Sequence, residues 1–148
     1  MNINHIAWSG ALLCLTAAAA PLDASATPLK SVQWKNRPLL VFAPSPEHPL
    51  LARQRAEIGR VMSGMIERDM IVVEIVGKSL RTVVGRSPSG GAVAFRRHYG
   101  VGLDAFRIIL VGKDGGRKLV SSKVVSSRKL FGLIDSMPMR RDEIRRKQ

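Results

Sequence analysis

Cysteine is almost absent from this chain of 148 residues, and the single Cys14 lies near the amino terminus. Residues 27–148 contain no thiol, so they exclude a disulfide and exclude thiol redox chemistry unless Cys14 is retained. Aromatic residues are also few, at 5% of the chain, which leaves Val, Ile, Leu and Met to fill most of the core. No repeat period is present, so we expect one domain with one hydrophobic core.

Acidic residues are scarce relative to basic ones. The chain has 11 Asp and Glu against 24 Lys and Arg, for a formal net charge of +13. Residues 27–148 keep every Lys and Arg but lose Asp23, so their net charge is +14. Such an excess predicts a positive field around the whole domain and favours anionic partners.

No hydrophobic run is long enough for a comfortable membrane span. The apolar stretch of residues 6–20 is followed by Ala24-Ser25-Ala26, which is typical of a secretory signal cleaved after Ala26. An uncleaved membrane anchor is the alternative interpretation. We therefore expect residues 1–26 to be a signal peptide and the remainder to be periplasmic or secreted.

The remaining pattern alternates strands and helices. Residues 39–43 form a continuous apolar run that ends at a proline-rich turn, as a strand buried on both faces does. Apolar residues at helical spacing predict one amphipathic helix over residues 48–68, and residues 70–76 predict a second buried strand. A strand, a helix and a strand in this order make a parallel crossover.

The second half predicts a helix over residues 92–99, closed by Gly100, and a third strand over residues 106–111. The turn at residues 113–116 leads into residues 118–125, so these two strands should pair antiparallel. A last helix over residues 128–136 covers the sheet, with Ser126-Ser127 as its cap.

The summed order is β-α-β-α-β-β-α, which is the thioredoxin-like arrangement. The fold class predicted is α/β, a three-layer sandwich around a mixed four-stranded sheet. Within it we expect an extended segment over residues 27–38, the thioredoxin-like domain over residues 39–138 and a basic tail over residues 139–148.

Four segments carry a family resemblance: QWKNRPLLVFAPS at 33–45, ERDM at 67–70, LVGKDGG at 110–116 and LIDSMPMRR at 133–141. They resemble the P-DUDES family, bacterial exported domains related to domains of vertebrate sushi-repeat and coiled-coil-containing matrix proteins. The resemblance covers nearly all of residues 29–146. It implies a thioredoxin-like, distantly peroxiredoxin-like fold without an assigned activity, and it supplies no catalytic residues.

In redox members of the thioredoxin-like fold, the reactive thiol follows the first strand. Here that place is occupied by Pro44, Ser45, Pro46, Glu47 and His48, none of which is a thiol. A serine hydrolase with Ser45 as nucleophile and His48 as its base is an alternative. A serine that caps a helix, in a turn stiffened by prolines, is the simpler interpretation, and we expect no catalytic residue here.

Methionine and histidine suggest one further alternative, a Cu(I) site. Met137 and Met139 flank Pro138, and His48 and His98 are the histidines of residues 27–148. Thioether sulfur suits Cu(I), but two Met residues and two separated His residues do not make a ligand set. We therefore predict no metal and no cofactor, and we expect Pro138 to end the last helix.

Two basic clusters are the predicted binding residues. One is near Tyr99 and the other is at the carboxyl end. A solvated surface is the simplest interpretation of such runs, although Arg binds phosphate and carboxylate groups well. The function predicted is therefore a non-enzymatic binding module for an anionic envelope component or a partner protein, and no nucleic-acid motif is present. The cluster residues are Arg96, Arg97, Arg140, Arg141, Arg145, Arg146 and Lys147.

Overall fold

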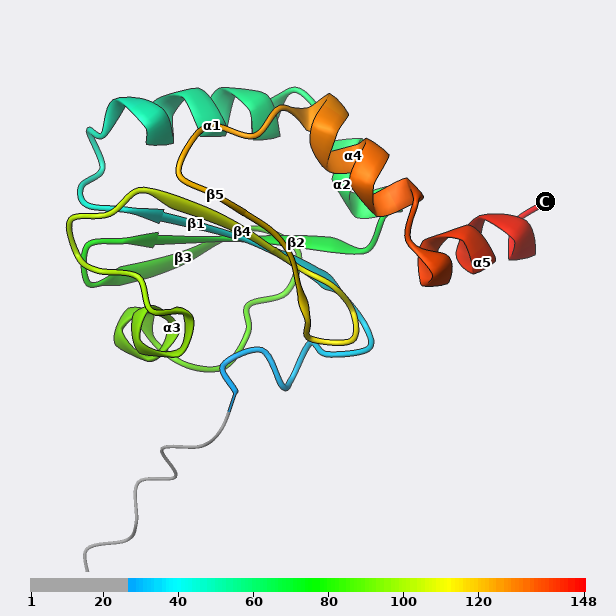
Figure 1. Ribbon diagram of the computed structural model, residues 1–148, viewed down its shortest axis with the longest axis horizontal. Helices are drawn as coiled ribbons and strands as arrows, with labels where there is room; N and C mark the ends of the chain where they lie inside the picture. The colour runs from blue at the N-terminus through cyan, green and yellow to red at the C-terminus, as the bar shows by residue number, and fades with distance from the viewer. Residues whose placement is uncertain (1–26) are drawn as a thin grey trace, which may run out of the picture.

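The computed structural model describes residues 27–148, and the predicted signal peptide of residues 1–26 lies outside them. The described chain is a mixed α/β domain built on one sheet (Figure 1). Its elements are β1 (Arg37–Ala43), α1 (Pro49–Gly59), α2 (Met62–Glu67), β2 (Met70–Val76), β3 (Ser79–Val84), α3 (Ala92–Tyr99), β4 (Arg107–Val111), β5 (Arg117–Ser121), α4 (Ser127–Asp135) and α5 (Pro138–Arg146).

The sheet has the order β3-β2-β1-β4-β5, with β1 at its centre. β1 pairs parallel with β2, as the crossover predicts, and antiparallel with β4. The predicted hairpin of β4 and β5 is confirmed, and Gly115 adopts a φ of 86° in its turn. All seven residues of β1 are buried, which explains the unbroken apolar run of residues 39–43.

Helices cover both faces of the sheet (Figure 1). On one face α1, α2 and α4 pack on alternate residues of β1, including Leu39 and Val41. On the other face α3 and the turns before β1 pack on Leu40 and Phe42. Alternation along one strand therefore supplies two separate hydrophobic cores.

The prediction of four strands is wrong, because β3 forms a fifth strand at the edge of the sheet. β3 pairs antiparallel with β2 after a turn at Gly77, whose φ is 55°. Its sequence, SLRTVV, is polar and only partly buried, since one side of an edge strand faces solvent. A search for continuous apolar runs does not detect such a strand.

The single helix predicted over residues 48–68 is interrupted between α1 and α2. Gly59 ends α1, and the backbone at Val61 leaves the helical region before α2 begins. Not all apolar residues of this segment face the core: Leu51, Ile58 and Met65 are buried, but Met62 and Ile66 are exposed.

Both ends of the described chain differ from the expectation. Residues 28–35 form successive turns, and Leu29 and Val32 of this segment are buried. At the other end Pro138 does not stop a helix but occupies the first turn of α5, where a missing N–H costs nothing. The predicted basic tail is therefore mostly helical. α3 with its Gly100 C-cap and α4 with its Ser126 cap are confirmed.

Candidate functional site

The carboxyl ends of β1 and β2 meet at one edge of the sheet, where ligands of open α/β sheets commonly bind. Arg96 of α3 reaches this edge and is 7% exposed. Its guanidinium donates hydrogen bonds to the carbonyl oxygens of Ala43 (2.8 Å), Ile75 (3.2 Å), Gly77 (2.9 Å) and Gly102 (2.5 Å). One predicted binding residue thus connects three segments of backbone through four carbonyl groups.

No carboxylate forms an ion pair with Arg96 among residues 27–148, although burial lowers its pKa. Backbone carbonyl dipoles therefore supply its hydrogen bonds without neutralising its charge. The edge keeps a positive charge.

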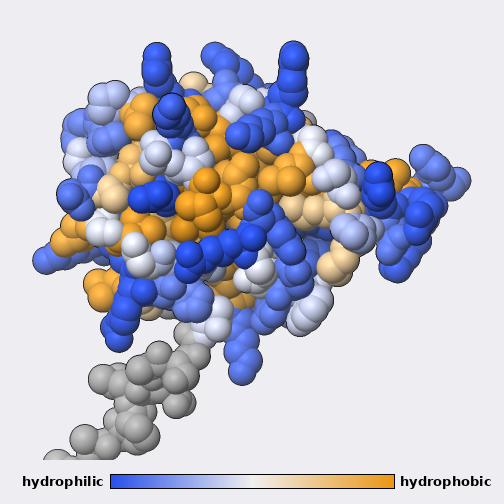
Figure 2. Space-filling model, viewed as in Figure 1, coloured by the Kyte–Doolittle hydropathy of each residue, from blue (hydrophilic) through white to orange (hydrophobic). Residues whose placement is uncertain are grey.

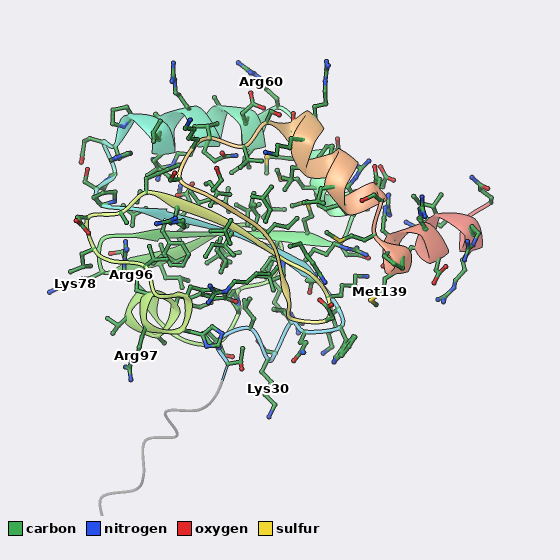
Figure 3. All side chains as sticks on the ribbon, viewed as in Figure 1. Lys30, Arg60, Lys78, Arg96, Arg97 and Met139 are labelled. Atoms are coloured by element: carbon green, nitrogen blue, oxygen red, sulfur yellow. The ribbon has the colours of Figure 1, made fainter. Side chains whose placement is uncertain are left out.

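Lys78 and Arg97 add two exposed cations beside Arg96. All three side chains line a depression of about 430 Å³, and Figure 3 shows them at the α3 end of the molecule. Val93 and Leu103, which are 59% and 53% exposed, form apolar parts of its wall. We call Lys78, Arg96, Arg97, Val93 and Leu103 the α3 site. Sequence analysis identified Arg96 and Arg97 but missed Lys78, which stands alone in its turn.

The loop of residues 44–48 follows β1 at the same edge. His48 stacks on Phe106, with ring centroids 5.5 Å apart and planes 4° apart, and its Nδ1 is buried without a hydrogen bond among the described residues. The hydrogen bond between Ser45 and His48 joins backbone atoms, from the His48 N–H to the Ser45 carbonyl at 3.3 Å. The structure therefore does not pair the Ser45 hydroxyl with the imidazole.

Ser45 does not cap α1, contrary to the expectation for this loop. The N-cap position belongs to His48, which makes no side-chain capping bond, and Pro49 begins the helix. Pro44, Pro46 and Glu47 complete the loop, with Pro46 and Glu47 exposed.

The carboxyl-terminal cluster is at the far end of the molecule from α3 (Figure 1). Arg140 is buried, at 2% exposure, and pairs with Glu67 at 2.7 Å and with Asp135 at 3.2 Å. Burial opposes its charge, but these hydrogen bonds raise the pKa of Arg140 on balance. The prediction that Arg140 is a surface binding residue is therefore not supported by its place in the structure.

The other basic residues of this cluster are exposed. Arg145 pairs with Asp142 within α5. Arg141, Arg146 and Lys147 have no ion-pair partner in the described part of the chain. The two predicted clusters thus do not form one site.

Arg140 belongs to an ion network that sequence analysis missed. Glu143 accepts hydrogen bonds from Arg37 at 2.9 Å and from Lys113 at 2.7 Å. Burial disfavours the charge of Glu143, but these cations outweigh it and lower its pKa to about 2. Arg68 pairs with Asp135 at 2.7 Å in the same region. The four segments that carry the family resemblance could have indicated this network, because each of them contributes a residue to it.

A second buried carboxylate lies within β2. Glu74 is 1% exposed and pairs with Arg55 and Arg81, each at 2.8 Å. Burial alone raises the pKa of Glu74, but the hydrogen bonds from both arginines lower it on balance. These ion pairs stabilise structure and leave the α3 site unneutralised.

Most of the basic surface is unpaired. Nine of the 24 Lys and Arg residues form ion pairs within residues 27–148, which leaves fifteen without one in that part of the chain. Figure 2 shows hydrophilic side chains projecting around one face, with hydrophobic ones between them. Eight of the ten acids are already paired, so internal pairing cannot neutralise the surplus.

The residues considered for Cu(I) are separated. Met137 and Met139 line a cavity of about 250 Å³ together with Arg37 and Lys113, whose charges oppose a metal cation. His98 belongs to α3. Within residues 27–148 no group of three or more His, Cys, Asp and Glu side chains is placed to hold a metal ion.

Comparison with known proteins gives one family. Residues 28–143 match the model described as "Domain of unknown function (DUF4174)". The chain is 29% identical to the Sushi repeat-containing protein SRPX of Rattus norvegicus, 28% to that of Mus musculus and 29% to that of Homo sapiens. Each alignment covers 95% of this chain and 32% of the relative, so the chain spans about a third of these proteins.

The expected relation to sushi-repeat proteins is thus supported, while the P-DUDES assignment stays a prediction. No solved structure matches the chain. None of the helices in residues 27–148 has the length and hydrophobicity that crossing a membrane requires.

Proposed function

Because the chain belongs to the family described as "Domain of unknown function (DUF4174)", whose description names no activity, we propose a function from the α3 site. The domain is a non-redox binding module for an anionic envelope component. The observation that carries this proposal is the convergence of Lys78, Arg96 and Arg97 on one depression without an ion-pair partner.

The ligand proposed is an anionic amphiphile such as an acidic lipid. Three cations attract a phosphate or carboxylate headgroup, and the exposed Val93 and Leu103 offer apolar contact beside it. A purely hydrophilic polyanion makes no use of those two side chains.

The proposal also includes export from the cytoplasm and a thioredoxin-like fold. Residues 1–26 support export to the periplasm or beyond, through their signal-like sequence. When β3 and α5 are set aside and α1 and α2 are taken as one helical segment, the elements follow the order β-α-β-α-β-β-α. This order supports a thioredoxin-like fold, in which the α3 site and the loop at residues 44–48 occupy the edge that carries the thiol in redox members.

The alternatives gain no specific observation. A hydrolase with Ser45 and His48 needs contact between a nucleophile and its base, and only backbone atoms of these residues are bonded. A Met and His copper site needs converging ligands, and Met137 and His98 line different cavities.

The test is co-sedimentation of the protein with vesicles of phosphatidylglycerol and phosphatidylcholine at low and high salt. We expect binding to the anionic vesicles alone, with strong weakening by salt. Reversal of two charges with Lys78→Glu and Arg97→Glu should weaken binding at least about tenfold, since each cation near an anionic surface contributes about 1 kcal/mol.

The matched control reverses two unpaired, exposed cations elsewhere, Arg53→Glu on α1 and Arg128→Glu on α4. It makes the same change in net charge. Equal weakening by both double variants would contradict a defined α3 site and leave only nonspecific attraction. Binding that neither salt nor either variant changes would contradict charge-driven binding at the α3 site, because it would show that the cations do not hold the protein on the vesicle.

A further inference from the structure

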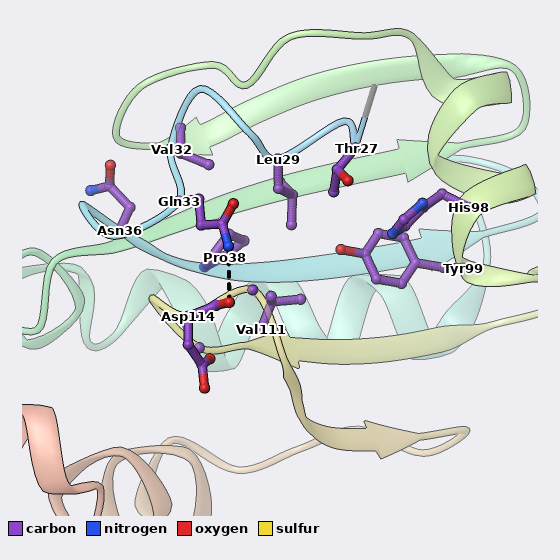
Figure 4. A pocket seen from close by; sticks show the side chains of 12 residues that line it. Thr27, Leu29, Val32, Gln33, Asn36, Pro38, His98, Tyr99, Val111 and Asp114 are labelled. Carbon is purple, nitrogen blue, oxygen red and sulfur yellow. Dashed lines mark hydrogen bonds between the residues drawn. The ribbon is translucent and has the colours of Figure 1, made fainter. Parts of the chain in front are cut away.

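A cavity of about 250 Å³ shares no lining residue with the depression of the α3 site. Its walls come from the turns before β1, the end of α3 and the hairpin of β4 and β5 (Figure 4). Leu29, Val32, Pro38 and Val111 make much of the wall apolar. We call this space the Tyr99 cavity.

Tyr99 presents its hydroxyl to this cavity. The residue is 6% exposed, and its hydroxyl makes no hydrogen bond to any described residue. Figure 4 shows that oxygen directed into the space, toward the side where Leu29 and Val111 lie. Unlike the His48 Nδ1, this oxygen is not fully buried, so it is accessible from the cavity and can donate a hydrogen bond to a molecule bound there.

The Tyr99 ring is held in place by its neighbours. Phe42 and Phe95 lie with ring centroids 6.3 and 6.4 Å away, and the Arg117 guanidinium lies 5.1 Å above the ring. Burial raises the pKa of Tyr99 to about 12, an effect that the charge of Arg117 partly opposes. The hydroxyl therefore remains a protonated donor at neutral pH.

The opposite wall has two polar side chains, the neutral Gln33 and Asp114, whose charge is neutralised by an ion pair. Gln33 donates from Nε2 to the Asp114 carbonyl at 2.9 Å, which leaves its Oε1 as an acceptor. The carboxylate of Asp114 pairs with Lys118 at 2.7 Å. No Lys or Arg lines the cavity among the described residues, so it differs in character from the α3 site.

We propose that the Tyr99 cavity binds a small uncharged molecule that has an apolar body and a carbonyl oxygen, which accepts the hydrogen bond of the Tyr99 hydroxyl. The volume suits a molecule of about one ring, since it lies below the 300–1,000 Å³ that is typical of drug-sized ligands. The carbonyl accepts from the Tyr99 hydroxyl, and the body covers the aliphatic wall. This site is independent of the proposed anion binding.

The test uses acetophenone as the probe and toluene as a matched probe without the carbonyl. In the full chain with labelled Leu and Val methyl groups, NMR titration with acetophenone should give saturable shifts at Leu29, Val32 and Val111. Leu130, which packs on the other face of the sheet, serves as the internal control and should not shift.

Two variants distinguish the contribution of the Tyr99 hydrogen bond from that of the cavity volume. Tyr99→Phe keeps the packed ring and should weaken acetophenone binding about 2–10-fold, the value of one hydrogen bond, without changing toluene binding. Thr27→Phe, at an exposed position on the rim, should weaken both probes by filling the entrance. The proposal is overturned if acetophenone gives no saturable shift at these methyl groups, or if Tyr99→Phe changes both probes equally.

Discussion

Arg96 has a structural role in addition to lining the α3 site. Its four carbonyl acceptors come from the ends of β1 and β2 and from the loops beside them. Removal of the guanidinium leaves those carbonyls without their buried donor, and hydrogen bonds to charged groups are stronger than neutral ones. Lys is not an equivalent replacement for Arg96. The planar guanidinium directs several N–H groups at four acceptors, and a single ammonium group cannot reach all of them.

We therefore predict that Arg96→Lys lowers the free energy of unfolding by roughly 2–4 kcal/mol, although it keeps the charge. Urea denaturation followed by circular dichroism measures the change. The control is Arg97→Lys at the adjacent exposed position, which should stay within about 0.5 kcal/mol of the parent. Similar effects of the two substitutions would contradict the structural role of Arg96.

Glu143 predicts an acid dependence of stability. Its pKa of about 2 in the folded chain lies below the ordinary value near 4.3, so folding favours the charged carboxylate. The resulting stabilisation is complete above the ordinary pKa and is lost as the pH falls toward about 2. We expect Glu143→Gln to be less stable at pH 7, by on the order of 2 kcal/mol, and to lose less stability on acidification.

The measurement is urea unfolding at several pH values between 2.5 and 7. The control is Asp142→Asn, which removes an exposed carboxylate from the same helix and should have little effect. If the two variants follow the same pH profile as the parent, the buried ion pairs of Glu143 do not contribute to stability.

At the residue scale, the sequence predicts which cations lie together only where neighbours in sequence carry the signal. Arg96 and Arg97 form a compact basic run, and they do line one depression. Arg140 belongs to a similar run, yet it is buried, because Glu67 and Asp135 pair with it. Charge runs show where cations occur but not which cations have partners distant in sequence.

Two glycines in the α1 and α2 region allow a matched test of packing. Gly59 ends α1, and a Cβ there has no atom within 4 Å, whereas a Cβ on Gly64 lies 2.8 Å from the Phe131 ring of α4. Gly59→Ala should raise the free energy of unfolding by about 0.5–1 kcal/mol, the usual gain of Ala over Gly in a helix. Gly64→Ala should lower it by roughly 1–3 kcal/mol through overpacking.

Thermal unfolding of both variants measures the two stability changes, which should have opposite signs. Phe131→Leu in the Gly64→Ala background should recover part of the loss by removing the ring. Stabilisation by Gly64→Ala would show that α2 and α4 are not packed as closely as the structure has them.

At the scale of elements, the sequence predicts well what is buried on both sides. β1, β2 and β4 are mostly apolar, and all three lie within the sheet. β3 and α5 were missed because β3 mixes polar and apolar residues and α5 is mostly polar. β3 is held by pairing with β2, and α5 is attached through its buried Arg140 and through Glu143. Such elements depend on long-range contacts that periodicity does not contain.

The charge of the whole molecule is distributed rather than local. The α3 site lies at one end, and the exposed cations of α5 lie at the other (Figure 1). A single chain that binds an anionic surface at both ends can join two surfaces. A chain that binds only through the α3 site coats one surface.

We predict that the protein clusters phosphatidylglycerol vesicles at low salt, as measured by light scattering. Arg141→Glu, Arg146→Glu and Lys147→Glu together should abolish clustering but leave single-vesicle binding nearly unchanged. This set omits Arg140, because the loss of a buried, paired guanidinium would destabilise the fold and confuse the result. Loss of binding and clustering together would place the main contact on α5 rather than on the α3 site. Unchanged clustering would show that the cations of α5 do not contact the second surface, so the positive charge at that end serves no binding role.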